Sequence, residues 1–215
     1  MTTSTINALS TEQTTLLTDD NFVIQTAAGI TKRIKATNVK LVGYDDYEFV
    51  YNTSVNASAP VLKTFQGGLK ASAFIGTGST DENLYAVIPI RHDIASTTFS
   101  FHIQWSHITA SPTGDVCWQI EYSIAKSFGV EAFPASTTIQ LIQTAGTQYF
   151  HHNIEGSNIT SSSIEPDSVI FVRLFRNASH ASDTFANDAF LLRASVHVSV
   201  DSRASTGKTR PFTKV

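Results

Sequence analysis

Apolar and polar side chains alternate with a period of two along three long segments of the chain. The first is residues 98–105, whose apolar positions are Phe99, Phe101, Ile103 and Trp105. The same period recurs in residues 116–124 and 192–200. Because successive side chains of a strand point to opposite faces, each segment predicts a strand with one face on a core and the other toward solvent.

Shorter strand signals, separated by turn residues, fill the space between these segments. They are residues 69–75, 85–90, 137–143, 147–154 and 168–176. Together the segments give about eight strands, the number that a jelly roll uses. The pattern predicts a mainly β protein with a jelly-roll-like antiparallel β-sandwich over residues 61–202.

The N-terminal part predicts a smaller element. Residues 21–26 and 30–34 are typical of two strands joined by a turn at 27–29, and residues 36–42 of a short helix or a last turn. A lone hairpin is marginal in water, so residues 1–43 are expected to dock on a partner. The side chains expected to make anchoring or oligomer contacts are Phe22, Ile24, Ile30, Lys32, Arg33 and Ile34.

Residues 44–60 and 203–215 are expected to lie outside both modules. The first stretch ends in a segment of Asn, Ser and Ala before Pro60 and predicts a linker, and the second predicts a polar basic tail. Within the sandwich, residues 169–175 are apolar on both faces apart from Arg173. A strand of this kind favours a second hydrophobic contact, and Ile170, Val172 and Leu174 are candidates for an oligomer interface.

Composition and charge limit the classes of partner that the protein is expected to bind. Charged residues are 15% of the chain, below the roughly 25% of an average globular protein, so hydroxyls and amides must coat the surface. A net charge of -3 gives no field for a phosphate backbone, which argues against nucleic acid. No apolar run reaches the roughly 18 residues of a membrane span, and the first ten residues lack a signal-peptide pattern, so no membrane insertion is expected.

The sequence holds no recognisable catalytic or metal motif, so we expect no enzyme and no cofactor. A nucleophile elbow and a phosphate-binding glycine loop are both missing, and the single Cys117 excludes an intrachain disulfide. His151 and His152 are neighbours on a predicted strand and point to opposite faces. His102 and His197 occupy the polar phase of their strands, where a solvated or cross-strand hydrogen-bonded imidazole is the ordinary outcome. A glycan receptor fits better, with the candidate binding residues Tyr44, Tyr47, His151, His152 and Asn153.

Two segments carry a resemblance to a known class of proteins. Residues 17–34, LTDDNFVIQTAAGITKRI, resemble the N-terminal modules of bacteriophage fibres and spikes, with an Asp-rich start, an apolar strand, a small-residue turn and a Thr-Lys-Arg return. Residues 181–192, ASDTFANDAFLL, and the alternating strand after them look like the closing segment of β-sandwich domains in phage and prophage virion proteins.

The resemblance implies a structural subunit of a tailed-phage virion, made in the host cytoplasm. It implies a homotrimer anchored to capsid, neck or tail proteins by its N-terminus and projecting the sandwich toward a host glycan. The chain lacks a long repetitive shaft, which favours a short fibre or a decoration protein. A carbohydrate-binding module outside this setting and a glycan-degrading tail enzyme remain the alternatives.

Overall fold

The computed structural model describes the backbone of residues 21–25 and 31–35, and residues 42–51, 58–78, 81–201 and 208 in full. The chain divides into two compact units, the first comprising residues 1–41 and the second beginning at Val42. Every regular element in the described ranges is a strand. The described residues contain no helix that is long and apolar enough to cross a membrane.

The first unit contains an antiparallel hairpin. Strand β1 (Asn21–Gln25) pairs with β2 (Thr31–Lys35) so that Phe22 lies opposite Ile34. The predicted hairpin is therefore confirmed for its two strands. The turn at 27–29, Ile30 and the helix or turn expected at 36–41 lie outside the described residues, as do the side chains named as anchoring contacts.

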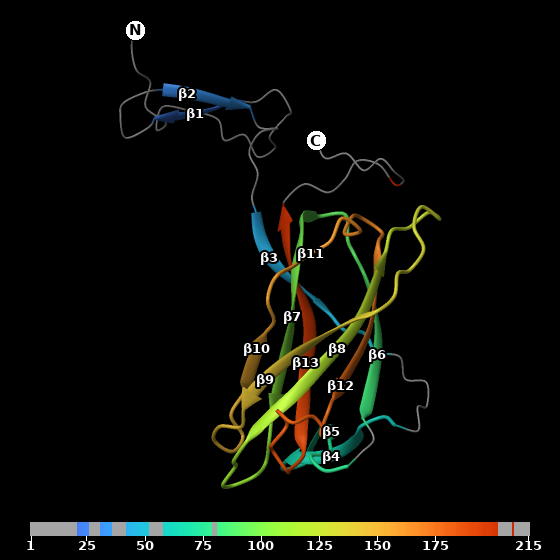
Figure 1. Ribbon diagram of the computed structural model, residues 1–215. Coiled ribbons are helices and arrows are strands. Elements are labelled where there is room, and N and C mark those ends of the chain that lie inside the picture. The colour runs from blue at the N-terminus through green and yellow to red at the C-terminus, as the bar shows by residue number, and fades with distance from the viewer. Residues whose placement is uncertain are drawn as a thin grey trace. The chain divides into compact units, whose positions relative to one another are not determined.

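The second unit is a sandwich of two antiparallel sheets (Figure 1). The larger sheet consists of β10 (His152–Glu155), β7 (Ile94–Ser106), β13 (Ala189–Asp201), β5 (Leu69–Phe74) and β4 (Val61–Gln66), with β3 (Val42–Glu48) on β13 and β11 (Ile159–Thr160) on β7. The smaller sheet consists of β6 (Glu82–Pro89), β12 (Val169–Arg176), β8 (Asp115–Ala125) and β9 (Thr137–Thr144). The predicted fold class is confirmed.

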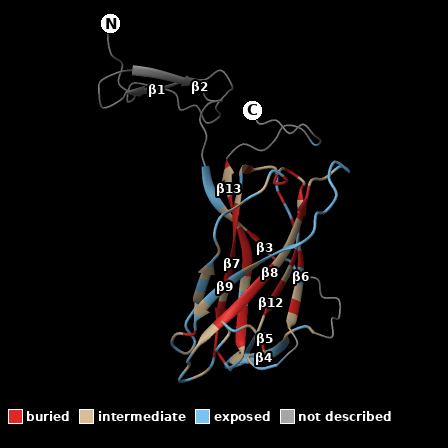
Figure 2. Cartoon of the chain, in the orientation of Figure 1, coloured by how far each residue is buried: buried red, intermediate tan, exposed pale blue. Residues whose placement is uncertain are grey.

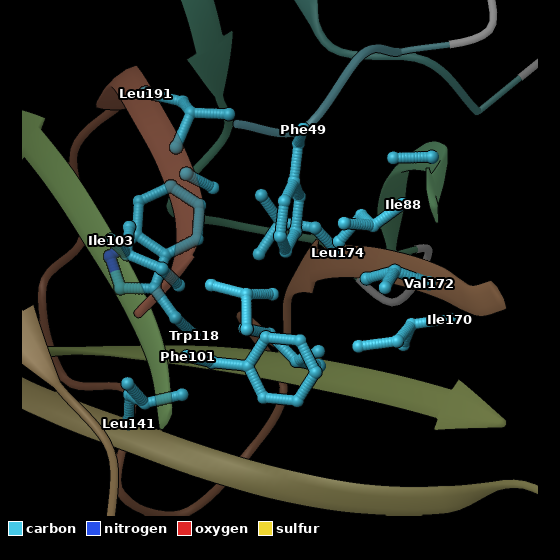
Figure 3. Close-up of a cluster of buried hydrophobic side chains, with 14 of the residues drawn as sticks. Phe49, Ile88, Phe101, Ile103, Trp118, Leu141, Ile170, Val172, Leu174 and Leu191 are labelled. Carbon is cyan, nitrogen blue, oxygen red and sulfur yellow. The ribbon is translucent and has the colours of Figure 1, made fainter. Parts of the chain in front are cut away.

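The core lies between the two sheets and follows the alternation of the sequence. Buried residues run along β7, β8, β12 and β13 (Figure 2), and the close-up shows Phe101, Trp118 and Leu174 converging from three strands (Figure 3). Phe74 packs edge-on against Trp118 with ring centroids 5.0 Å apart. Each such side chain contributes roughly 1.5–3 kcal/mol by leaving water, so the two-residue period of the sequence accounts for the stability of the sandwich.

The structure corrects the predicted linker. Residues 42–48 form strand β3 on β13, and the side chains of Tyr47 and Phe49 enter the core while Glu48 between them stays exposed. The described part of 44–60 thus belongs largely to the sandwich, while residues 52–57 and, except for Lys208, the predicted tail lie outside the described residues. Strand β10 also begins later than expected, because residues 147–149 form a bend and turn in which Tyr149 adopts a positive φ of 61°.

One face of strand β12 is wholly buried in the sandwich core. Ile170, Val172 and Leu174 all belong to the core of their own chain, so they offer no surface to another subunit. On the opposite face Phe175 is buried, whereas Phe171 is 51% exposed and meets the ring of Phe133 edge-on at 5.2 Å. The second apolar face that the sequence indicated is therefore real, and Phe171 is its exposed phenylalanine.

A buried ion pair fastens the segment between β12 and β13. The side chains of Arg176 and Asp183 are each 1% exposed, and Arg176 Nη2 donates to Asp183 Oδ1 over 2.7 Å. The guanidinium also donates to the backbone carbonyls of Phe74, Phe185 and Asn187. Because a buried charge is tolerated only when it is paired and hydrogen-bonded, this network holds the segment against the sandwich.

Candidate functional site

Polar side chains from four strands meet on the outer face of the larger sheet. The register of β13 places His197 opposite Asp46 of β3 and opposite Ser100 of β7. One step along, His102 of β7 lies opposite Ser195 of β13 and opposite Glu155 of β10. Directly opposite residues share a face, so the side chains converge. We call Asp46, His102, Glu155, Arg193 and His197 the open cluster.

His197 stands between two carboxylates. Its Nε2 lies 2.6 Å from Asp46 Oδ1 and its Nδ1 lies 2.9 Å from Glu155 Oε1. A neutral imidazole has one N–H and can donate to one of these oxygens only. The second contact therefore requires one of two things. Either the ring carries a second proton and is an imidazolium, or a bound metal cation lies between the ring nitrogen and the carboxylate.

His102 is the buried member of the open cluster, at 4% exposure. Its Nδ1 lies 3.2 Å from Ser195 Oγ, and that hydroxyl donates to Asp46 Oδ1 over 3.4 Å. The two histidine rings lie 4.6 Å apart, centroid to centroid. The Nε2 of His102 is buried and has no hydrogen-bond partner among the described residues. A nitrogen of this kind is costly unless a ligand uses it.

Charged neighbours complete the face. Arg193 bridges Asp46 Oδ2 at 3.2 Å and Glu48 Oε1 at 3.0 Å. A hydrogen bond from Ser100, followed by that from His197, holds the pKa of Glu155 below its usual range. Glu155 is therefore a carboxylate at neutral pH, and the face carries fixed charges of both signs.

Two adjoining pockets open on this face. One, of about 360 Å³, is lined by Tyr44, Asp45, Asp46, Glu48, Arg193 and His197. The other, of about 370 Å³, is lined by Tyr44, Ser96, Thr98, Phe99, Ser100, Glu155, Asn158, His197 and Ser199. Tyr44 and His197 belong to both, so the pockets form one polar groove. Carboxylates and a guanidinium dominate the walls of the first pocket, whereas the second combines hydroxyls, a carboxylate and an amide with apolar surface.

No family model and no curated protein matches this chain. Solved structures with a similar fold include the N-terminal endo-1,4-β-D-xylanase 10B modules of Clostridium thermocellum complexed with xylohexaose, with 12% identity, a TM-score of 0.38 and coverage of 71% of this chain and 28% of the other. The infectious bursal disease virus Gx strain structure has 10% identity, a TM-score of 0.34 and coverages of 85% and 37%. TmCBM61 in complex with β-1,4-galactotriose has 10% identity, a TM-score of 0.27 and coverages of 75% and 86%. This chain thus spans well under two thirds of the first two.

Only one of the candidate receptor residues lies in the groove. Tyr44 is 85% exposed and lines both pockets. Tyr47, three residues along the same strand, points into the core and donates from its hydroxyl to Asp93 Oδ1 over 2.9 Å. Burial, helped by this hydrogen bond, raises the pKa of Tyr47 far above its usual range. Tyr47 is a structural residue, because successive side chains of a strand alternate in direction.

The candidates His151, His152 and Asn153 lie on and before β10, and none of them lines the two pockets. His152 stacks on the indole of Trp105, with centroids 4.4 Å apart. Burial lowers its pKa, so His152 is a neutral packing residue near pH 7. His151 and Asn153 are exposed.

The sequence interpretation missed five functional candidates, namely the members of the open cluster. A signal existed, since His102, Arg193 and His197 all fall on the polar phase of alternating segments. The pairing of β7, β13 and β3 was not readable from the same pattern, because Asp46 and His197 are 151 residues apart in the chain.

Proposed function

We propose that this chain is a non-catalytic virion subunit of a tailed bacteriophage that binds glycan through the groove on its larger sheet. The observation that carries the glycan assignment is the pair of adjoining pockets that share Tyr44 and His197. Sites for drug-like ligands are lined mainly by apolar groups, whereas this groove joins a mainly polar pocket to one that combines hydrogen-bonding groups with apolar surface. A polyhydroxylated ligand suits such walls.

The exposed ring of Tyr44 supplies the apolar part of the site. A sugar presents hydroxyls at its rim and C–H groups on its faces, so it can lie on an aromatic ring while its hydroxyls reach Glu155, Asn158 or Arg193. Carboxylates and guanidinium groups form charge-assisted hydrogen bonds, which are about twice as strong as neutral ones. Tyr44 is not packed in the core, so it is available for this contact.

Virion attachment rests on the likeness of residues 17–34 to phage fibre modules. The β1–β2 hairpin, in a unit separate from the sandwich, is consistent with an anchor. On this proposal the trimer, the other virion proteins and the host surface are the partners, and the virion is the location.

A glycan array with the full-length protein tests the binding role. We expect saturable binding to a subset of glycans, loss of that binding in Tyr44→Ala, and unchanged binding in Tyr85→Ala. Tyr85 is a matched control because it is partly exposed on the other sheet. Equal binding by both variants would place the glycan elsewhere, and sugar release on long incubation would overturn the non-catalytic assignment.

Particle assembly tests the virion role. Particles supplied with a chain lacking residues 1–41 should carry no copies of it, whereas the full-length chain is incorporated. Light scattering should give about three times the chain mass of 23.4 kDa. Incorporation of the shortened chain argues against the anchor, and a monomeric mass at micromolar concentration argues against the trimer.

A further inference from the structure

Three metal-ligating side chains of the open cluster come from three adjacent strands. Asp46 on β3, His102 on β7 and His197 on β13 each offer one ligand atom, and these atoms lie within 4.8 Å of one another. The pairing of β13 with both neighbours fixes this grouping. Two imidazoles and one carboxylate form a donor set that zinc and other late first-row divalent ions prefer.

A neutral His197 ring cannot donate a hydrogen bond to both of the carboxylates that it contacts. With Nδ1–H of His197 donated to Glu155, its Nε2 is a bare acceptor facing the acceptor Asp46 Oδ1 at 2.6 Å. His102 presents Nδ1 as its ligand atom, 3.9 Å from the same oxygen of Asp46. We propose that Asp46, His102 and His197 form a binding site for a divalent transition-metal ion, with zinc as the ion that fits best.

The spacing of the ligand atoms suits such an ion. Bonds of 2.0–2.2 Å in a tetrahedral site put neighbouring ligand atoms roughly 3.3 Å apart. Around Asp46 Oδ1, the distances are 2.6 Å to His197 Nε2 and 3.9 Å to His102 Nδ1. These values lie on either side of the required separation. Closure on an ion therefore requires Asp46 Oδ1 to move away from His197 Nε2 and toward His102 Nδ1.

Two of the three ligands are oriented by a further group. Glu155 accepts from Nδ1 of His197 and so directs Nε2 toward the ion, the carboxylate–histidine–metal arrangement common in zinc proteins. Arg193 holds the second oxygen of Asp46, and Ser195 donates to the first. His102 would exchange the contact of its Nδ1 with Ser195 Oγ for the bond to the ion.

The local charge favours a dication. Asp46, Glu48 and Glu155 are three carboxylates within this network, and Arg193 is the one guanidinium that pairs with them among the described residues. With neutral histidines, two negative charges are left, and a divalent ion neutralises them. Asp46 and His197 also line the pocket of about 360 Å³, so water or a ligand oxygen can take the remaining coordination position.

Zinc binding by the intact protein tests the site independently of any glycan. The full-length chain, stripped with a chelator and dialysed, is titrated with zinc chloride in a calorimeter. We expect one ion per chain with a micromolar or tighter dissociation constant and a raised melting temperature. Absence of saturable binding at millimolar zinc overturns the proposal and leaves His197 as an imidazolium bridge.

Variants locate the ion. His197→Gln and Asp46→Asn change partly exposed residues and should abolish the saturable phase, while Glu155→Gln should weaken binding about 10-fold. His151→Gln, at an exposed histidine outside the open cluster, should bind as the parent does. Near-ultraviolet circular dichroism checks that each variant keeps the fold. Parent-like zinc binding by folded His197→Gln and Asp46→Asn overturns the assignment.

Discussion

The sandwich contains two ionic clusters that use similar residues in opposite ways. The buried ion pair of Arg176 and Asp183 is 1% exposed on both sides, and the guanidinium finds carboxylate or carbonyl acceptors at Nε, Nη1 and Nη2. The open cluster is partly exposed, and its His197 faces a carboxylate oxygen at each ring nitrogen with only one N–H in the neutral form. The first cluster is complete within the chain, whereas the second has binding capacity left for a ligand.

This difference separates a structural role from a binding role. A saturated buried network fixes one conformation, because any change leaves a charge unpaired in a dry environment. A partly solvated network costs little to rearrange, since water replaces each lost partner. Perturbing the two clusters should therefore give large and small losses of stability respectively.

The largest expected effect comes from Arg176→Met, which leaves the buried carboxylate of Asp183 without its partner. We expect a loss of about 3–5 kcal/mol in the free energy of unfolding, measured by urea denaturation. Arg91→Met is the matched control, because Arg91 pairs with Asp45 and Asp93 at about half exposure and should cost no more than about 1 kcal/mol. Similar losses in both variants would contradict the comparison.

The two clusters also differ in how far the sequence could predict them. The strands and much of the core follow from alternation, because apolar residues such as Phe101 and Trp105 occupy one phase of residues 98–105. The partners of Arg176 and of His197 do not follow from it, because register is set by contacts between distant segments. Only the pairing of β3 with β13 shows that Tyr44 and Tyr47 point to opposite faces of a strand.

A smaller effect is expected from Gly114→Ala, beside the segment that the buried ion pair fastens. Gly114 has a φ of +97°, and an added Cβ would lie 2.4 Å from the carbonyl oxygen of Thr184. Strain and overpacking together should cost about 1–3 kcal/mol or more in the free energy of unfolding. Gly68→Ala has open space around the added Cβ and should change stability by less than about 0.5 kcal/mol. A tolerated alanine at 114 would show that the segment adjusts freely.

The pH dependence of stability should arise at buried histidines near this same segment. His107 contacts the ring of Phe185, donates from Nε2 to the carbonyl of Gly146 and accepts at Nδ1 from the amide of Thr109. Both nitrogens are thus used by the neutral ring. Burial lowers the pKa of His107 and that of His152 below the ordinary value of 6.5.

The direction in which stability changes with pH follows from proton uptake by the folded and unfolded chains. Above pH 6.5 the rings are neutral in both states, and stability is complete. Below it the unfolded chain binds the protons first, so stability falls until the lowered folded-state pKa is passed, by at most about 1.4 kcal/mol per pH unit for each ring. Urea denaturation between pH 7.5 and 5 measures this slope. His152→Phe should reduce this slope of the free energy of unfolding against pH, and His151→Gln should leave it unchanged. A slope unaffected by His152→Phe would show that His152 does not contribute to the pH dependence.

The smallest expected effect is that of His197→Gln measured in chelator. His197 and its partners Asp46 and Glu155 have side chains between a quarter and a half exposed, and ion pairs of this kind contribute about 0–1 kcal/mol. A loss within that range, next to the far larger loss in Arg176→Met, would establish that the open cluster is dispensable for the fold. Added zinc sharpens the contrast, because the parent should gain stability and His197→Gln should not. A loss above about 3 kcal/mol in chelator would instead make the open cluster a second structural clamp.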